Sequence, residues 1–145
     1  MLCLLALQPL EAKKKVAQKS VYMVGVAFVL TDSTVYLTDM HLVDSVTIEK
    51  KTKFLMDRQL YSFQLQRYLQ QAYKGGPYVP SVFFSPNRKK MERKYLALHK
   101  RYVQSKEFGM VLVDQGQFRF KPEKYVEVEE KPVTSSKKKK SKKKS

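Results

Sequence analysis

Residues 20–31 read SVYMVGVAFVLT, a run rich in Val, Tyr and Phe whose middle is apolar without strict alternation. Such a run is typical of a strand that is covered on both faces. A two-residue turn at Asp32 and Ser33 follows, and residues 34–38 (TVYLT) and 45–50 (SVTIEK) predict two further strands. Together the three segments predict an antiparallel meander.

The hydrophobic period changes to that of a helix after residue 50. Thr52 is a candidate N-cap, and the Gly-Gly-Pro sequence at 75–77 predicts a stop. We therefore expect a helix of about six turns over residues 53–74. Its first half is apolar on two sides, whereas its second half has one apolar side and one that is largely glutamine.

Residues 78–85 (YVPSVFFS) are predicted to be an extended linker between two helices. Pro80 and Pro86 keep the residues before them out of the helical conformation. Because the linker is short and hydrophobic, we expect it to lie on the protein surface, with Phe83 and Phe84 packing against a partner.

A second helix is predicted over residues 86–106, where Ser85 is a candidate N-cap and Pro86 suits the first helical position. Its apolar residues recur at i, i+4, i+7 and i+11, which places them on one face. That face comprises Met91, Tyr95, Leu98 and Tyr102, and the cations outside it are Lys89, Lys90, Arg93, Lys94, Lys100 and Arg101. The pattern therefore predicts a helix with one apolar face and one strongly basic face.

The C-terminal third returns to a strand pattern. Residues 110–114 (MVLVD) and 117–121 (QFRFK) flank Gln115 and Gly116, which indicates a hairpin, and residues 124–129 predict an edge strand. The element order is then β-β-β-α-α-β-β. This order predicts a small α+β domain with a mainly antiparallel sheet and two long helices.

One domain is expected from 145 residues, of which 43% are hydrophobic. We place it at residues 20–131, between an N-terminal extension (1–19) and a Lys-rich tail (132–145) whose like charges predict disorder. Cys3 is the only cysteine, which suits a reducing, intracellular compartment. The apolar start MLCLLAL has no positive region before it, and no run of about 20 apolar residues exists, so neither a secretory signal nor a transmembrane segment is predicted.

The positive charge of the chain is concentrated in two stretches. The net charge is +16, from 29 Lys or Arg and 13 Asp or Glu. Residues 86–106 carry eight Lys or Arg against Glu92 alone, and residues 137–145 (KKKKSKKKS) carry seven Lys and no acid. A localised positive field attracts a localised polyanion, and nucleic acid is the commonest large polyanion in a cell.

Catalytic and metal-binding chemistry has little support in the sequence. His41 and His99 are the only histidines, and neither has a cysteine or a second histidine at metal-ligand spacing. Asp32, Asp39 and Asp44 suit either a divalent-metal or acid–base cluster or ordinary turns, and we favour turns. We therefore predict a protein that is not an enzyme and has no cofactor, metal or small-molecule substrate.

Binding of nucleic acid through its backbone is the favoured hypothesis. Lys outnumbers Arg by 23 to 6, which favours contact with phosphates over recognition of bases. Phe118 and Phe120 alternate with two cations and either stack on bases or point into the core, and we favour the core. The predicted nucleic-acid-binding residues are Arg88, Lys89, Lys90, Arg93, Lys94, Lys100, Arg101, Arg119, Lys121, Lys137, Lys138, Lys139, Lys140, Lys142, Lys143 and Lys144.

Three interpretations of the Lys-rich tail stay open. It suits sequence-independent neutralisation of phosphates, a nuclear import signal, or attachment to an anionic membrane surface. All three depend on the same charge.

The sequence is similar in composition to ribosomal proteins as a class, which are small and basic and combine one domain with a charged extension; no motif carries the similarity. We therefore expect a non-enzymatic structural subunit of a ribonucleoprotein particle, bound to RNA (ribosomal RNA by preference) and to neighbouring proteins. The expected location is the ribosome of the cytosol or an organelle, or the nucleus or nucleolus. The alternative is a protein-interaction module of an acidic assembly, such as cytoskeleton, chromatin or a membrane surface, with the tail as an electrostatic tether.

Overall fold

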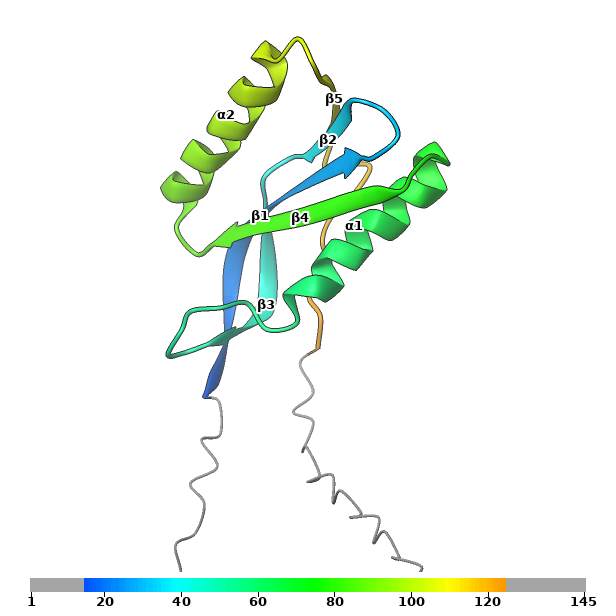
Figure 1. The fold of residues 1–145 in the computed structure, drawn as a ribbon. Coiled ribbons are helices and arrows are strands. Elements are labelled where there is room, and N and C mark those ends of the chain that lie inside the picture. The colour runs from blue at the N-terminus through cyan, green and yellow to red at the C-terminus, as the bar shows by residue number, and fades with distance from the viewer. Residues whose placement is uncertain (1–14, 125–145) are drawn as a thin grey trace, which may run out of the picture.

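The computed structural model describes residues 15–124, which form one five-stranded sheet between two helices (Figure 1). The predicted α+β class, with a mainly antiparallel sheet and two long helices, is confirmed. The order β-β-β-α-β-α-β differs from the predicted one by a strand between the helices and by a single strand after them. The elements are β1 (Val16–Val29), β2 (Thr34–Thr38), β3 (His41–Glu49), α1 (Arg58–Tyr73), β4 (Tyr78–Ser85), α2 (Arg88–Gln104) and β5 (Gly109–Val113).

β1 is the central strand, and it begins at Val16, four residues before the predicted start. It pairs antiparallel with β2, β3 and β4. Because Tyr22 and Met23 pair with β3 and β4 at once, these two strands lie on opposite edges of β1. β2 and β3 lie one after the other along the same edge of β1, β2 beside its C-terminal part and β3 beside its N-terminal part. The three predicted strands are antiparallel, but the predicted meander is wrong, because β2 and β3 each pair with β1 and not with each other.

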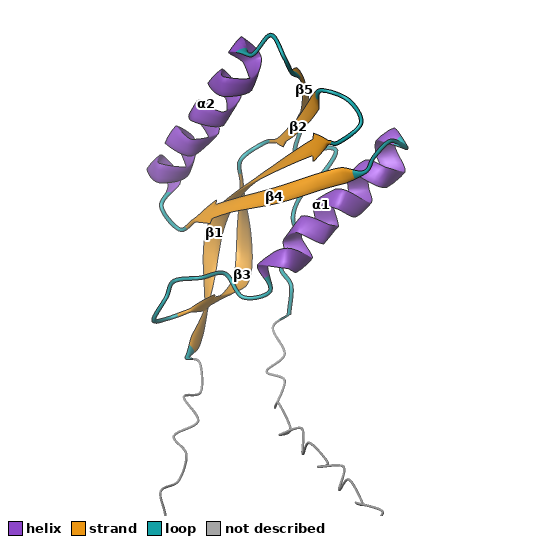
Figure 2. Cartoon of the chain, in the orientation of Figure 1, coloured by secondary structure: helices purple, strands orange, loops and turns teal. Residues whose placement is uncertain are grey.

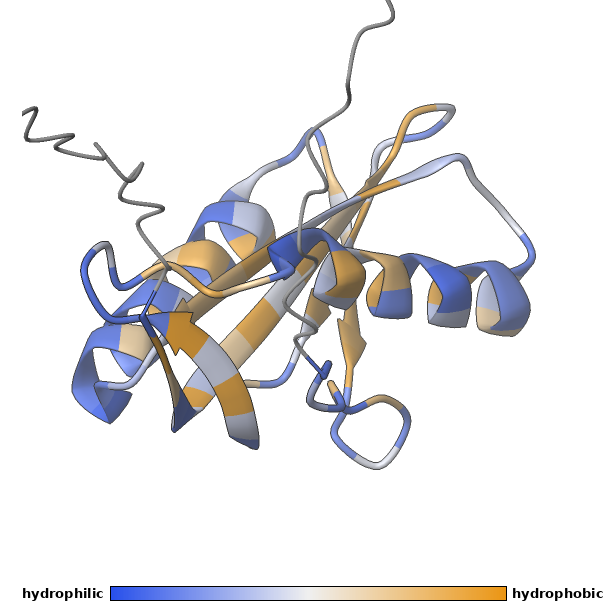
Figure 3. Ribbon diagram, turned by 90° about the horizontal axis from the view of Figure 1, so that it is seen from below, coloured by the Kyte–Doolittle hydropathy of each residue, from blue (hydrophilic) through white to orange (hydrophobic). Residues whose placement is uncertain are grey.

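Side chains of β1 alternate between two cores, which confirms the prediction of a strand covered on both faces. Val21, Met23 and Ala27 pack with buried residues of α1, whereas Val24 and Val26 pack with buried residues of α2. Apolar residues are accordingly concentrated on the strands between the two helices (Figure 3). α1 and α2 thus cover opposite faces of the sheet.

The predicted linker at residues 78–85 is wrong, because this segment is strand β4. It pairs with β1 over eight consecutive positions, and only its extended conformation was foreseen. The carbonyls of Tyr78 and Val82 accept hydrogen bonds from the α1 side chains of Gln66 (3.2 Å) and Arg58 (2.6 Å). Alternation gives Pro80 the same outward orientation, so its missing N–H removes no ladder bond from this edge strand.

The predicted C-terminal hairpin is also wrong. β5 pairs in parallel with β2, which makes the sheet mixed (Figure 2). Residues 117–121 form no strand: the Phe120 N–H donates to His41 Nε2 (2.9 Å) and the Lys121 N–H donates to Gln64 Oε1 (2.9 Å). Side-chain acceptors thus replace the partner strand that a hairpin would supply. The edge strand predicted over residues 124–129 lies outside the described residues, apart from Lys124.

α1 begins at Arg58, later than predicted. The Thr52 side chain does not cap a helix; its hydroxyl donates to Glu49 Oε2 (2.9 Å). Leu55 is buried and forms an isolated antiparallel bridge with Ile48, so the segment before α1 folds back on the end of β3. Burial of Leu55 in the core therefore outweighs the helix propensity of these residues. α1 does end where the Gly-Gly-Pro sequence predicts, at Tyr73.

Candidate nucleic-acid interface

The core fixes how α2 is rotated about its own axis. Met91, Leu98 and Tyr102 are buried and Tyr95 is partly buried, which confirms the predicted apolar face. Burial, together with the nearby Asp39 carboxylate, raises the pKa of Tyr95, so its hydroxyl stays neutral. All residues outside this face are directed toward the flanks of the helix or toward solvent.

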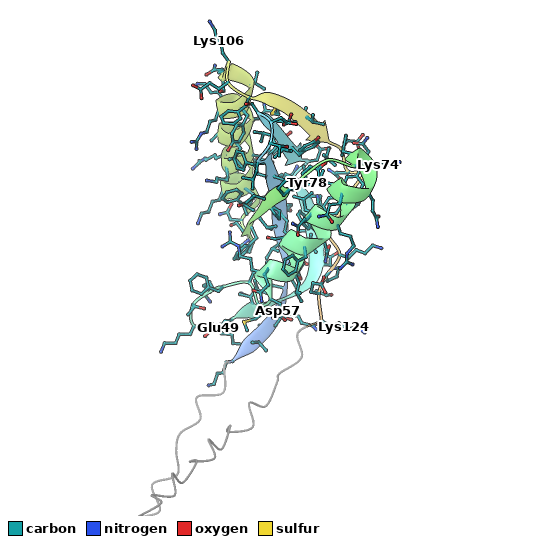
Figure 4. All side chains as sticks on the ribbon, turned by 45° about the vertical axis from the view of Figure 1, so that its right-hand side comes forward. Glu49, Asp57, Lys74, Tyr78, Lys106 and Lys124 are labelled. Carbon is teal, nitrogen blue, oxygen red and sulfur yellow. The ribbon has the colours of Figure 1, made fainter. Side chains whose placement is uncertain are left out.

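The seven predicted nucleic-acid-binding residues of α2, Arg88 included, are all exposed. Nitrogen-tipped side chains project from the outer side of this helix in Figure 4. Within residues 15–124 the one ion pair joins Arg88 to Glu92 (2.9 Å), and it spans a single turn at the surface. Arg93 and Lys100 are therefore not neutralised by carboxylates of the described fold.

The cations of α2 form two groups around the helix axis. At roughly 100° per residue, Lys89, Arg93 and Lys100 lie directly opposite the apolar face. Lys90 and Lys94 lie on the flank that meets β4, where Lys94 Nζ stands 4.5 Å from the centroid of the Phe83 ring. One group therefore faces solvent and the other faces a neighbouring strand.

A groove of about 510 Å³ lies where β4 passes into α2. Arg58, which was not predicted, joins three predicted cations there: it donates to the Val82 carbonyl, and its guanidinium lies 5.8 Å from the centroid of the Phe84 ring. No sequence pattern indicates this role, because β4 must first pair with β1 before the starts of α1 and α2 come together. The groove is lined by Arg58, Phe83, Phe84, Ser85, Lys90, Met91, Arg93 and Lys94.

Arg119 and Lys121 are exposed but do not join the cations of α2. Phe120 between them is buried against Tyr61 and His41, in the core beneath α1. Phe118 is partly buried against the same core, so the favoured interpretation of the two Phe residues is confirmed. The sheet thus separates these two cations from the basic helix.

His41 has a structural role in the fold. Its Nε2 accepts the Phe120 N–H, so its Nδ1 carries the proton and donates to the Asp39 carbonyl (3.0 Å). Its ring stacks on Phe120 with centroids 5.5 Å apart. Burial lowers the pKa of His41, and the neutral form is the one that this geometry requires.

The three turn aspartates bond to separate partners. Asp32 accepts from the Thr34 N–H (2.8 Å), Asp39 from the Gln115 N–H (3.3 Å) and Asp44 from the Ser20 hydroxyl (2.6 Å). Across residues 15–124 no three His, Cys, Asp or Glu side chains are grouped so as to hold a metal ion.

The predicted tail lysines at residues 137–144 lie outside the described part of the chain. No helix in residues 15–124 combines the length and the hydropathy needed to cross a membrane. Comparison with known protein families, curated proteins and solved structures finds no match to this chain.

Proposed function

We propose that this protein is a non-enzymatic subunit of a ribonucleoprotein particle, a ribosome by preference, and that it holds RNA through the outer face of α2. The observation that carries the proposal is the row of exposed cations on this face, which the buried opposite face fixes in place. Within residues 15–124 these cations have no carboxylate partner beyond the Arg88–Glu92 pair. A fixed row of cations contacts several phosphates at once, whereas a flexible one loses conformational entropy on binding.

The predominance of Lys over Arg supports contact with the RNA backbone. Lys is a compact point charge, whereas Arg is the usual choice for two-pronged recognition of a base edge. On α2 the solvent-facing residues Lys89 and Lys100 lie about three turns apart on one side, a spacing that follows an extended phosphate backbone. The protein is therefore expected to bind many RNA sequences with similar affinity.

The salt dependence of RNA binding tests this proposal. Each phosphate contact on a single strand contributes roughly 0.7 to the slope of log affinity against log salt. The double variant Lys89→Gln/Lys100→Gln changes two residues that lie outside the groove. It should make the slope shallower by about 1.4. Fluorescence anisotropy with a short uridine-rich RNA over a range of salt concentrations measures it.

The matched control is Lys50→Gln/Lys51→Gln, which removes two exposed charges from the turn after β3, away from α2. This control should keep the slope of the unmodified protein. Equal slopes for all three proteins would overturn the proposal.

A second candidate function is docking on a neighbouring protein of an acidic assembly. It is favoured by Leu96 and Val103, which are 63% and 56% exposed and lie seven residues apart on one side of α2. Leu112 of β5, a strand that α2 contacts, is also exposed. If this were the sole function, RNA affinity would be the same in the Lys89→Gln/Lys100→Gln variant as in the unmodified protein.

A further inference from the structure

The groove between β4 and α2 differs in chemistry from the outer face of the helix. Phe83 packs with the core beneath α2, whereas Phe84 packs with the core beneath α1. Because consecutive strand residues point to opposite faces, a groove lined by both rings runs across the free edge of β4. Its floor is therefore apolar and reachable from the side of the sheet.

The rim of the groove carries four cations, Arg58, Lys90, Arg93 and Lys94, and no acidic residue of the described segment, 15–124, lines it. Two of them are held against the aromatic floor, since Lys94 lies over Phe83 and Arg58 lies near Phe84. Arg58 is further fixed by its hydrogen bond to the Val82 carbonyl. The positive charge is thus placed beside flat apolar surfaces.

We infer that this groove holds an unpaired nucleotide of single-stranded RNA; the inference rests on the proposed function. An aromatic floor stacks on a base of any sequence, and a cationic rim meets the phosphates on either side of it. The volume of about 510 Å³ lies in the range of small-ligand sites. A duplex keeps its bases stacked inside and presents only its backbone, so it uses the rim but not the floor.

The cations alone would be enough to bind an acidic peptide, which has no need of the two Phe rings. An inorganic polyanion would likewise gain nothing from these rings. The paired presence of rings and cations therefore favours the single strand. Each ring has a cation beside it, but the Arg58 guanidinium is farther from the Phe84 centroid (5.8 Å) than Lys94 Nζ is from the Phe83 centroid (4.5 Å), so Phe84 is the ring better suited to receive a base.

Equilibrium binding of the full chain at physiological salt tests the inference. The probes are a uridine-rich single-stranded RNA, an RNA duplex of equal length and a poly-glutamate peptide. Phe84→Leu keeps an apolar side chain but removes the flat ring, and it should weaken binding of the single strand by about tenfold while leaving the duplex unchanged. Phe63→Leu, at an exposed ring of α1 outside the groove, is the matched control and should change neither.

The outcomes separate this inference from the proposed function. Salt-dependent RNA binding that Phe84→Leu and Phe63→Leu leave equally unaffected would overturn the nucleotide site alone. Poly-glutamate is the third probe. If it displaces the single strand from the unmodified protein but not from the Phe84→Leu variant, the groove is a peptide site, and the proposed nucleotide site is overturned as well. Equal salt slopes for the unmodified protein and the Lys89→Gln/Lys100→Gln variant would overturn the proposed function instead. Thermal unfolding of each variant confirms that the fold is retained.

Discussion

At the scale of single residues, Gly25 sets how closely α1 approaches the sheet. It lies in the middle of β1, and its N–H donates to the buried Thr38 hydroxyl (2.8 Å). A Cβ atom at this position would lie 2.7 Å from Leu65 Cδ2 and 2.9 Å from Phe120 Cζ. Both the helix and the C-terminal segment therefore pack where a side chain would otherwise be.

Gly25→Ala should lower the free energy of unfolding by about 1–3 kcal/mol, because Leu65 and Phe120 must move to make room. Gly109→Ala is the control: a Cβ there meets nothing within 4 Å, and the change should stay within about 0.5 kcal/mol. Urea denaturation followed by circular dichroism measures both. Similar values for the two variants would show that the packing over Gly25 is looser than described.

His41 makes the fold sensitive to acid. In the folded state its pKa is lowered by burial, whereas in the unfolded chain it has its ordinary value of about 6.5. Below that pH the unfolded chain binds a proton that the folded protein does not, so stability is full above about 6.5 and falls as the pH drops toward the folded pKa.

We expect the unfolding free energy to decline by up to about 1.4 kcal/mol per pH unit on account of this residue. His41→Gln should make the decline shallower, whereas His99→Gln should leave it in place. Urea titrations at several pH values between neutral and mildly acidic measure the slope. A slope that His41→Gln does not change would assign the acid sensitivity to other groups.

At the scale of elements, α2 is the one whose character was most predictable. Its apolar residues recur at helical spacing, and local periodicity needs no knowledge of the partner. The predicted N-cap, Ser85, is wrong. Ser85 is the last residue of β4, and its hydroxyl accepts a hydrogen bond from the Asn87 N–H (3.1 Å). Asn87 is the N-cap, and its side chain accepts the Lys90 N–H (3.1 Å).

Asn87→Ala should therefore cost about 1 kcal/mol of unfolding free energy, the usual value of a lost cap. Asn87→Asp retains the acceptor and places a negative charge at a helix N-terminus, which is favourable, so it should restore most of the loss. Thermal unfolding of the two variants measures the difference. If the two variants have the same unfolding temperature, the cap hydrogen bond is not what stabilises the start of α2.

At the scale of the whole molecule, the features that could not be predicted are those that depend on distant pairing. β1 was recognisable because both of its faces are apolar, but the partner of β4 is decided by which edge of β1 remains open. The same holds for β5, whose parallel pairing with β2 leaves no local signal. Arg58 reaches the groove only as a result of these pairings. The sequence therefore indicated the α2 cations of the site but not the contributions of Arg58 and β4.

β2 receives its second partner late. The hairpin of β1 with β2 closes over a short turn, whereas Thr34 pairs with Gly109 across 74 intervening positions. Short closures cost less entropy and form faster, so we expect the outer edge of β2 to stay open until nearly all of the described chain has been synthesised. During that interval the open strand edge is a template for the same segment of another nascent copy. The time taken to translate the chain between β2 and β5 thus sets how long each new molecule is exposed to misassembly.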